Sequence, residues 1–194
     1  MKILIAVPTF ETITPETFKS IYDLDTAGHV VSFDFVKGYD CAKARNAIAA
    51  KAMQGGFDYL FMIDSDIIVP PDSINHFLEI PVDICFGVYP HKNTNNGKAE
   101  IFKLGTDNFE LRFSYKELTV PRIKIKGAGF GCAFIRVDVL KEMRYPYFKY
   151  AIHNSGSFLG EDLYFCDEAA KLGMDIWADT RVRCGHLARY FQYE

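Results

Sequence analysis

Two aspartates that follow an apolar run are the residues of this chain best suited to chemistry. Asp64 and Asp66 stand one residue apart, directly after residues 60–63, and Pro70 follows a few positions later. A buried strand that ends in two carboxylates concentrates negative charge at a sheet edge, which is costly unless a cation neutralises it. Carboxylate oxygens suit Mg²⁺ and Mn²⁺. The pattern therefore predicts a divalent-metal site that holds a phosphate-bearing substrate.

A second pair of aspartates has the same spacing but a different context. Asp23 and Asp25 follow a helix-like segment and precede residues 26–28, which read Thr-Ala-Gly. Because no apolar strand comes before this pair, we interpret it as a helix end. The spacing alone is therefore a weak signal, and the strand before Asp64 and Asp66 carries the prediction.

The elements that must position these residues alternate along the first half of the chain. Thr14 and Pro15 suit the N-cap and the first position of a helix, and Gly55 suits a helix end. An alternation of strands and helices implies a parallel sheet with right-handed crossovers. Such a sheet binds ligands at the carboxyl ends of its strands. The expected strands are residues 2–7, 30–36, 59–63 and 84–89, and the expected helices are residues 15–24, 42–54 and 71–79.

The pattern changes after residue 89. Residues 90–126 place turn-forming residues between short extended runs, which predicts a small antiparallel insertion. The glycine-rich stretch 127–131 predicts a loop whose backbone can closely approach a neighbouring group. Beyond it we expect a strand at 133–136, a helix at 137–143, an irregular segment at 146–160, a helix at 161–172, and strands at 175–178 and 181–184.

Further candidate residues lie where the parallel strands are expected to end. Pro8 and Thr9 end the first strand, and Arg45 and Asn46 lie near the start of the second helix. The Arg45 guanidinium offers a fork of donors that can neutralise a diphosphate, and Asn46 can hydrogen-bond ribose or base. The alternative is that Arg45 is an ordinary surface residue.

Two adjacent acids open the helix expected at 161–172. Glu161 and Asp162 follow Gly160, and a helix N-terminus favours the charged form of a carboxylate. A carboxylate in that position is suited to accept a proton. The alternative is that the pair simply stabilises the first turn of the helix, where acids are common.

Composition limits the classes to which the protein can belong. With 194 residues, 49% of them apolar, the chain is expected to form one domain with a substantial core. No apolar run reaches the roughly 18 residues of a membrane span, and the start of the sequence does not read as a signal peptide. The five cysteines form no Cys-x-x-Cys pair, which argues against a zinc site or a disulfide framework and favours the cytoplasm.

The charge of the chain is unevenly distributed. The formal net charge is −3, yet residues 89–126 carry more Lys and Arg than Asp and Glu. Such a basic segment can face an anionic partner such as DNA, although a solvated antiparallel sheet is the favoured interpretation.

The motifs together resemble those of the GT-A glycosyltransferases. The strand that ends in Asp64 and Asp66 resembles the Asp-x-Asp motif of that family, and the stretch at 44–47, Ala-Arg-Asn-Ala, looks like its family 2 type. The resemblance covers residues 1–90 and 127–187. It implies an α/β, single-domain, Rossmann-like GT-A fold over residues 1–194, with a mostly parallel central sheet, helices on both faces and a small antiparallel insertion. Its expected parts are a nucleotide-sugar half at 1–89, the insertion at 90–126 and an acceptor half at 127–194.

The resemblance also implies a role for each candidate residue. Asp64 and Asp66 would hold the metal and the ribose, with Asp66 the more direct ligand. His186, which follows the last strand, would complete the metal shell; the alternative is a structural histidine. Asp162 would be the catalytic base of an inverting reaction, with Glu161 as the alternative. Pro8, Thr9, Arg45 and Asn46 would lie near the nucleotide.

The expected activity is that of a metal-dependent, hexosyltransferase-type enzyme. The resemblance implies a nucleotide diphosphate sugar donor, most simply a UDP-sugar, with Mn²⁺ or Mg²⁺. The acceptor is a glycan, a protein or modified DNA, and the small phage and bacterial members are the nearest analogy. Alternative interpretations are a phage-type enzyme that glycosylates modified DNA bases, a nucleotidyltransferase and a non-catalytic nucleotide-sugar binder. The sequence does not indicate an oligomeric state.

Overall fold

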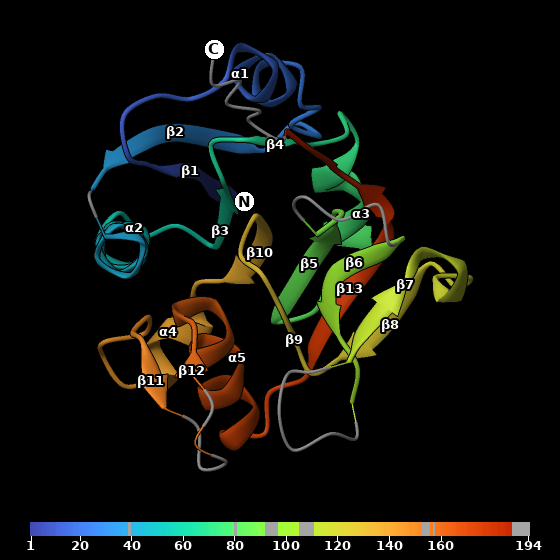
Figure 1. The fold of residues 1–194 in the computed structure, drawn as a ribbon. Helices are drawn as coiled ribbons and strands as arrows, with labels where there is room; N and C mark the ends of the chain where they lie inside the picture. The colour runs from blue at the N-terminus through green and yellow to red at the C-terminus, as the bar shows by residue number, and fades with distance from the viewer. Residues whose placement is uncertain are drawn as a thin grey trace, which may run out of the picture.

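The chain folds around a seven-stranded sheet with the strand order β2-β1-β3-β10-β5-β13-β8 (Figure 1). The structure is a computed structural model that describes residues 1–38, 40–79, 81–91, 97–104, 111–152, 156 and 158–187. Strands β2, β1, β3, β5 and β13 run in one direction, while β10 and β8 run against them. This is a mixed α/β domain with a mostly parallel central sheet.

The first half of the chain forms the elements that its sequence predicts. Thr14 caps α1, and the side chain of Asp40 caps α2 by accepting from Lys43 N. Both helices connect parallel strands, as the crossover rule requires. The elements are β1 (Lys2–Thr9), α1 (Pro15–Tyr22), β2 (Val30–Lys37), α2 (Cys41–Gln54), β3 (Tyr59–Ile63), β4 (Ile67–Ile68), α3 (Ser73–Glu79) and β5 (Ile84–Val88).

The second half departs from expectation in three places. The segments expected as two short strands form the single strand β13, because its residues pair on both sides with β5 and β8. Strand β8, expected within the insertion, completes the edge of the central sheet. The start of the expected glycine loop is strand β9, which pairs with β6.

The remaining elements are short. They are β6 (Lys98–Phe102), β7 (Arg112–Ser114), the 3₁₀ turn Tyr115–Glu117, β8 (Arg122–Ile125), β9 (Gly127–Ala128), β10 (Cys132–Arg136), α4 (Asp138–Glu142), β11 (Ala151–Ile152), β12 (Phe158–Leu159), α5 (Glu161–Lys171), β13 (Ile176–Arg183) and β14 (Gly185–His186). Strands β11 and β12 pair within the segment expected to be irregular. Parts of the insertion, residues 92–96 and 105–110, lie outside the described residues.

Helices cover both faces of the sheet, as expected. Successive side chains of a strand point to opposite faces, so the residues of β1 divide between two cores. Leu4 packs in a cluster with residues of α2 and α5, whereas Ile5 packs in a second cluster with residues of α1 and α3.

Candidate functional site

A pair of two-residue strands brings His186 beside the paired aspartates. Strand β14 pairs with β4, which follows Asp66 directly, so that His186 lies opposite Ile67. Leu187 N also donates a hydrogen bond to the Asp66 carbonyl, at 2.9 Å. The result places His186 Nε2 3.8 Å from Asp66 Oδ2. Residues that are far apart in the sequence therefore meet at one point of the sheet edge.

The environment of His186 selects one form of its ring. Nδ1 lies 2.8 Å from the Pro90 carbonyl oxygen, and a carbonyl can only accept, so Nδ1 carries the hydrogen. In the neutral imidazole this leaves the lone pair of Nε2 facing the Asp66 carboxylate. An imidazole nitrogen and a carboxylate oxygen in this arrangement can both bind one divalent cation.

The donor set at this point fits a divalent cation. One imidazole nitrogen and one carboxylate suit Mn²⁺ and Zn²⁺ somewhat better than Mg²⁺. Within the described residues, no group of three or more His, Cys, Asp and Glu side chains gathers closely enough to hold a metal ion. Asp66 and His186 would therefore hold the ion together with ligands from the substrate and water.

Arg45 has different partners from the diphosphate that its sequence context suggested. Its side chain is buried, with 3% of the residue exposed. Nη2 lies 2.9 and 3.1 Å from the two carboxylate oxygens of Asp64, and Nη1 donates to Glu161 Oε1 at 2.6 Å. The guanidinium also lies over the Phe130 ring, 5.4 Å from its centroid. Arg45 thus joins the end of β3 to the start of α5 and neutralises two acids.

Asn46 also has partners within the protein. Its Oδ1 accepts from Tyr147 N and Phe148 N, at 2.9 and 3.2 Å. Its Nδ2 donates to the Ala42 and Phe148 carbonyls, at 2.8 and 2.6 Å. A primary amide has two donors and two acceptor sites, and all are occupied here. In place of the predicted contact with ribose or base, Asn46 holds the segment before β11 against α2.

The loop after β1 reaches the turn that carries the aspartates. Pro8 is buried at the end of β1, and Thr9 is partly exposed beside it. The Thr9 hydroxyl donates to the Thr12 carbonyl at 2.7 Å, which tightens the loop. Thr14 N then donates to the Ser65 carbonyl at 3.1 Å. Pro8 and Thr9 therefore lie on the same edge of the sheet as Asp64 and Asp66.

The two acids that open α5 differ in environment. Glu161 is held by Arg45, whereas Asp162 Oδ1 accepts only from the neighbouring Leu163 N, at 2.8 Å, among the interactions of the described residues. The pKa of Asp162 is raised to about 6, mainly because the side chain is buried and also because of the Glu161 charge, while the Arg45 charge acts to lower it. A carboxylate with a pKa near neutrality is suited to accept a proton and release it again.

Tyr89 is a site residue that the sequence did not reveal. Its hydroxyl accepts from Gly131 N at 3.0 Å, and its ring meets His186 edge-on, with centroids 5.3 Å apart. The Gly131 carbonyl in turn accepts from Asp64 N at 3.0 Å. A Cβ on Gly131 would lie 2.7 Å from Tyr89 Cζ. The glycine at 131 therefore makes room for Tyr89. The only sign of Tyr89 in the sequence was its position at the end of an expected buried strand.

The basic character of the insertion is largely balanced inside the protein. Four of its cations pair with acids: Lys103 with Glu117, Arg112 with Glu100, Arg122 with Asp179, and Lys124 with Asp175. These pairs reduce the positive charge that this segment presents to an anionic partner such as DNA.

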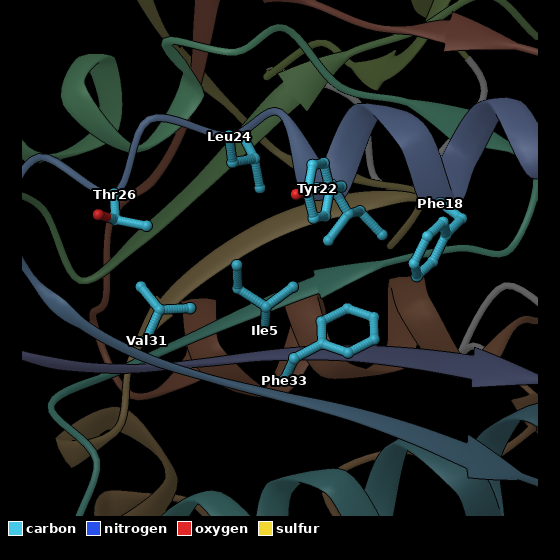
Figure 2. A pocket seen from close by; sticks show the side chains of 8 residues that line it. Ile5, Phe18, Tyr22, Leu24, Thr26, Val31 and Phe33 are labelled. Atoms are coloured by element: carbon cyan, nitrogen blue, oxygen red, sulfur yellow. The ribbon is translucent and has the colours of Figure 1, made fainter.

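An apolar cavity lies away from these charged residues, between α1 and the strands β1 and β2 (Figure 2). Its volume is about 300 Å³. Figure 2 shows Val31, Ile5 and Phe33 on the strands facing Leu24, Tyr22 and Phe18. Because its lining offers few polar groups, it does not have the character of a phosphate or metal site.

Comparisons with solved structures identify the fold. The chain is similar to A197 from STIV, with a TM-score of 0.67 and 16% identity over 97% of this chain and 87% of that one. It is similar to GalNAc-T7 in complex with UDP, GalNAc and Mn²⁺, with a TM-score of 0.66, 11% identity, and coverage of 97% of this chain and 44% of that one. It is also similar to TarS 1–349 of S. aureus, with a TM-score of 0.57, 14% identity, and coverage of 96% and 60%.

These likenesses define the class of protein by its architecture. The structures matched are glycosyltransferases and a viral protein of GT-A type, and this chain has the GT-A fold. No protein-family model and no curated protein sequence matches the chain. The chain spans less than two thirds of the TarS fragment and of GalNAc-T7. Among the described residues, no helix is long and apolar enough to cross a membrane.

Proposed function

We propose that this protein is a metal-dependent glycosyltransferase that uses a nucleotide diphosphate sugar, most simply a UDP-sugar. The observation that carries the proposal is the meeting of Asp66 and His186 at the sheet edge where Asp64 and Asp162 also lie. The structure of GalNAc-T7 contains UDP, GalNAc and Mn²⁺, and one structure of TarS contains UDP. Those ligands support the choice of donor and metal.

The residues of the site divide the work of sugar transfer. A divalent ion held by Asp66 and His186 would neutralise the departing diphosphate. Asp64, oriented by Arg45, would accept a hydrogen bond from a ribose hydroxyl. Asp162 would take the proton of the acceptor hydroxyl as that oxygen attacks the sugar, which gives inversion of configuration. Glu161 would keep Arg45 in place, because it accepts a hydrogen bond from the guanidinium.

The experiment that tests this proposal begins with the donor. Purified protein is titrated calorimetrically with UDP, with and without Mn²⁺, and then screened for hydrolysis of a panel of nucleotide sugars. We expect UDP binding that requires Mn²⁺ and that Asp66→Ala abolishes. The matched control is Asp72→Ala, which removes an exposed carboxylate near the start of α3. Binding of UDP that is equally tight without metal, or unchanged in Asp66→Ala, would refute the metal-dependent function.

A further inference from the structure

A second cavity lies along α5, beyond the carboxylates of the proposed active site. Its volume is about 400 Å³, and its lining comes from the segment after α4 and from one face of α5. Figure 1 shows α4, α5 and the β11–β12 pair gathered in one part of the molecule. The residues that line the cavity are Arg144, Tyr145, Pro146, Lys149, Tyr164 and Glu168.

The charge of this cavity is positive and unbalanced. Its one acid, Glu168, pairs with Lys171 at 2.7 Å. The Lys149 ammonium lies 4.6 Å from the centroid of the Tyr164 ring and forms no ion pair with any residue that the structure describes. Arg144 is exposed, and within the described ranges it has neither an acidic partner nor a hydrogen bond. Two cations therefore border a space whose own acid is already neutralised.

Arg144 differs from the other described arginines in its bonding partners. Those at 45, 112, 122, 136 and 181 pair with carboxylates, and that at 183 donates to the Thr180 carbonyl. In the part of the chain that the structure describes, Arg144 is the one arginine without such a partner. A guanidinium fork suits a carboxylate or a phosphate, and a ligand carrying one would provide the missing partner.

The aromatic side chains of the cavity suit the rest of such a ligand. Tyr145 is 65% exposed, and its ring meets that of Tyr147 edge-on at 5.7 Å. Tyr164 forms another wall of the cavity, under the Lys149 ammonium. Exposed tyrosine rings present an apolar face and a hydroxyl together, which suits the mixed apolar and polar surface of a sugar ring.

The cavity is in a fixed position relative to the proposed base. Tyr164 comes one helical turn after Glu161 on α5, and its backbone N–H donates to the Gly160 carbonyl at 2.9 Å. Lys149 follows Phe148, whose backbone is bound by the Asn46 amide. A ligand in the cavity would thus extend along the same helix that carries Asp162.

We propose that this cavity binds an anionic group of the acceptor, so that the acceptor is an acidic glycan bearing carboxylates or phosphates. The proposal rests on the proposed function, because it assigns the acceptor side of that reaction. Arg144 and Lys149 bind the anionic group, and Tyr145 and Tyr164 pack against the adjoining sugar ring.

The test measures binding of defined probes in the absence of donor. Calorimetry compares an oligogalacturonate, a sugar phosphate and a neutral oligosaccharide of equal length, and a single-stranded oligonucleotide serves as the nucleic-acid arm. We expect an anionic saccharide to bind more tightly than the neutral one. The double variant Arg144→Gln, Lys149→Gln should weaken binding of the anionic saccharide at least tenfold. The comparison of uronate with sugar phosphate identifies which anion is bound. The matched control is Lys141→Gln, a nearby exposed lysine paired with Asp138, which should change nothing.

Three results would overturn the proposal. The first is that neither anionic saccharide binds. The second is that the double variant binds them as tightly as the wild type does. The third is that the oligonucleotide binds more tightly than the saccharides and loses affinity in the double variant. UDP titration with Mn²⁺, run on the same samples, distinguishes failure of the acceptor assignment from failure of the proposed function. If UDP binds and the saccharides do not, the donor reaction stands and only the acceptor assignment fails.

Discussion

Replacing Asp162 by asparagine should slow the proposed sugar transfer and stabilise the protein at the same time. Asparagine keeps the size and polarity of the side chain but cannot accept a proton, so the transfer rate should fall by about 10² to 10⁴. Binding of metal and donor should be unchanged, because Asp66 and His186 are untouched. In the wild type, a pKa near 6 leaves about 90% of the carboxylate ionised at pH 7 and about 10% at pH 5, so the rate should fall nearly tenfold between these values.

The stability change follows from the same buried carboxylate. Its pKa rises from 3.8 to about 6 on folding, so the folded state binds the proton more tightly than the unfolded state does. Between these two values the native protein holds more protons, and its stability therefore falls as the pH rises. The full loss amounts to about 3 kcal/mol at pH 7, counted as 1.36 kcal/mol for each pKa unit. Asp162→Asn carries no charge and should recover much of this loss.

Two measurements check these expectations. Urea unfolding of the wild type and of Asp162→Asn at pH 4.5 and pH 7.5 should show a greater advantage for the variant at pH 7.5. Product formation from a nucleotide sugar and an acceptor should follow the ionisation of Asp162 in the wild type only. A variant that transfers sugar at the wild-type rate, or that is less stable than the wild type at pH 7.5, would refute the assignment. A product with retained configuration would remove the need for a base altogether.

Three further predictions concern the other residues of the site. His186→Ala should weaken Mn²⁺ binding by about tenfold or more while leaving the melting temperature without metal nearly unchanged; a variant that unfolds yet binds Mn²⁺ normally would indicate a structural histidine. Arg45→Met should lower the free energy of unfolding by about 3–5 kcal/mol, because two carboxylates lose their buried counter-charge, and urea titration that shows no loss would contradict that role. Gly131→Ala should lower the free energy of unfolding by about 1–3 kcal/mol, because the new methyl group clashes with Tyr89. Adding Tyr89→Ala in the same chain should relieve part of this clash, whereas losses that simply add would show that the two residues are not coupled.

Local patterns in the sequence predicted most of the elements and the edge of the sheet that carries the site. Thr14 and Pro15 mark the start of α1, and the apolar run before Asp64 forms β3. Glu161 and Asp162 open α5 where the sequence placed a helix start. Capping, periodicity and burial act over a few neighbouring residues, so they can be recognised without knowledge of the rest of the fold.

The partners of the polar residues were decided by the tertiary structure. Arg45 bonds to Asp64 and to Glu161, and the latter lies 116 positions further along the chain. Its position near the start of α2 suggested an exposed ligand for a diphosphate, but packing buries it between two carboxylates. Asn46 likewise forms three of its four amide hydrogen bonds with a distant backbone segment. Sequence patterns cannot show which distant groups a buried polar side chain will meet, although burial requires that it meets some.

The sequence by itself determined a strand that ends in paired carboxylates, and a histidine close to the C-terminus. The pairing of β14 with β4 brings His186 to Asp66, a meeting that the family resemblance implied but that no local pattern in the sequence shows. The tertiary structure decided that the Tyr89 ring meets His186 edge-on and that the two acids of α5 have different environments. The physical reason is that burial and electrostatic environment depend on every element packed around a group, whereas the sequence pattern records only its neighbours along the chain.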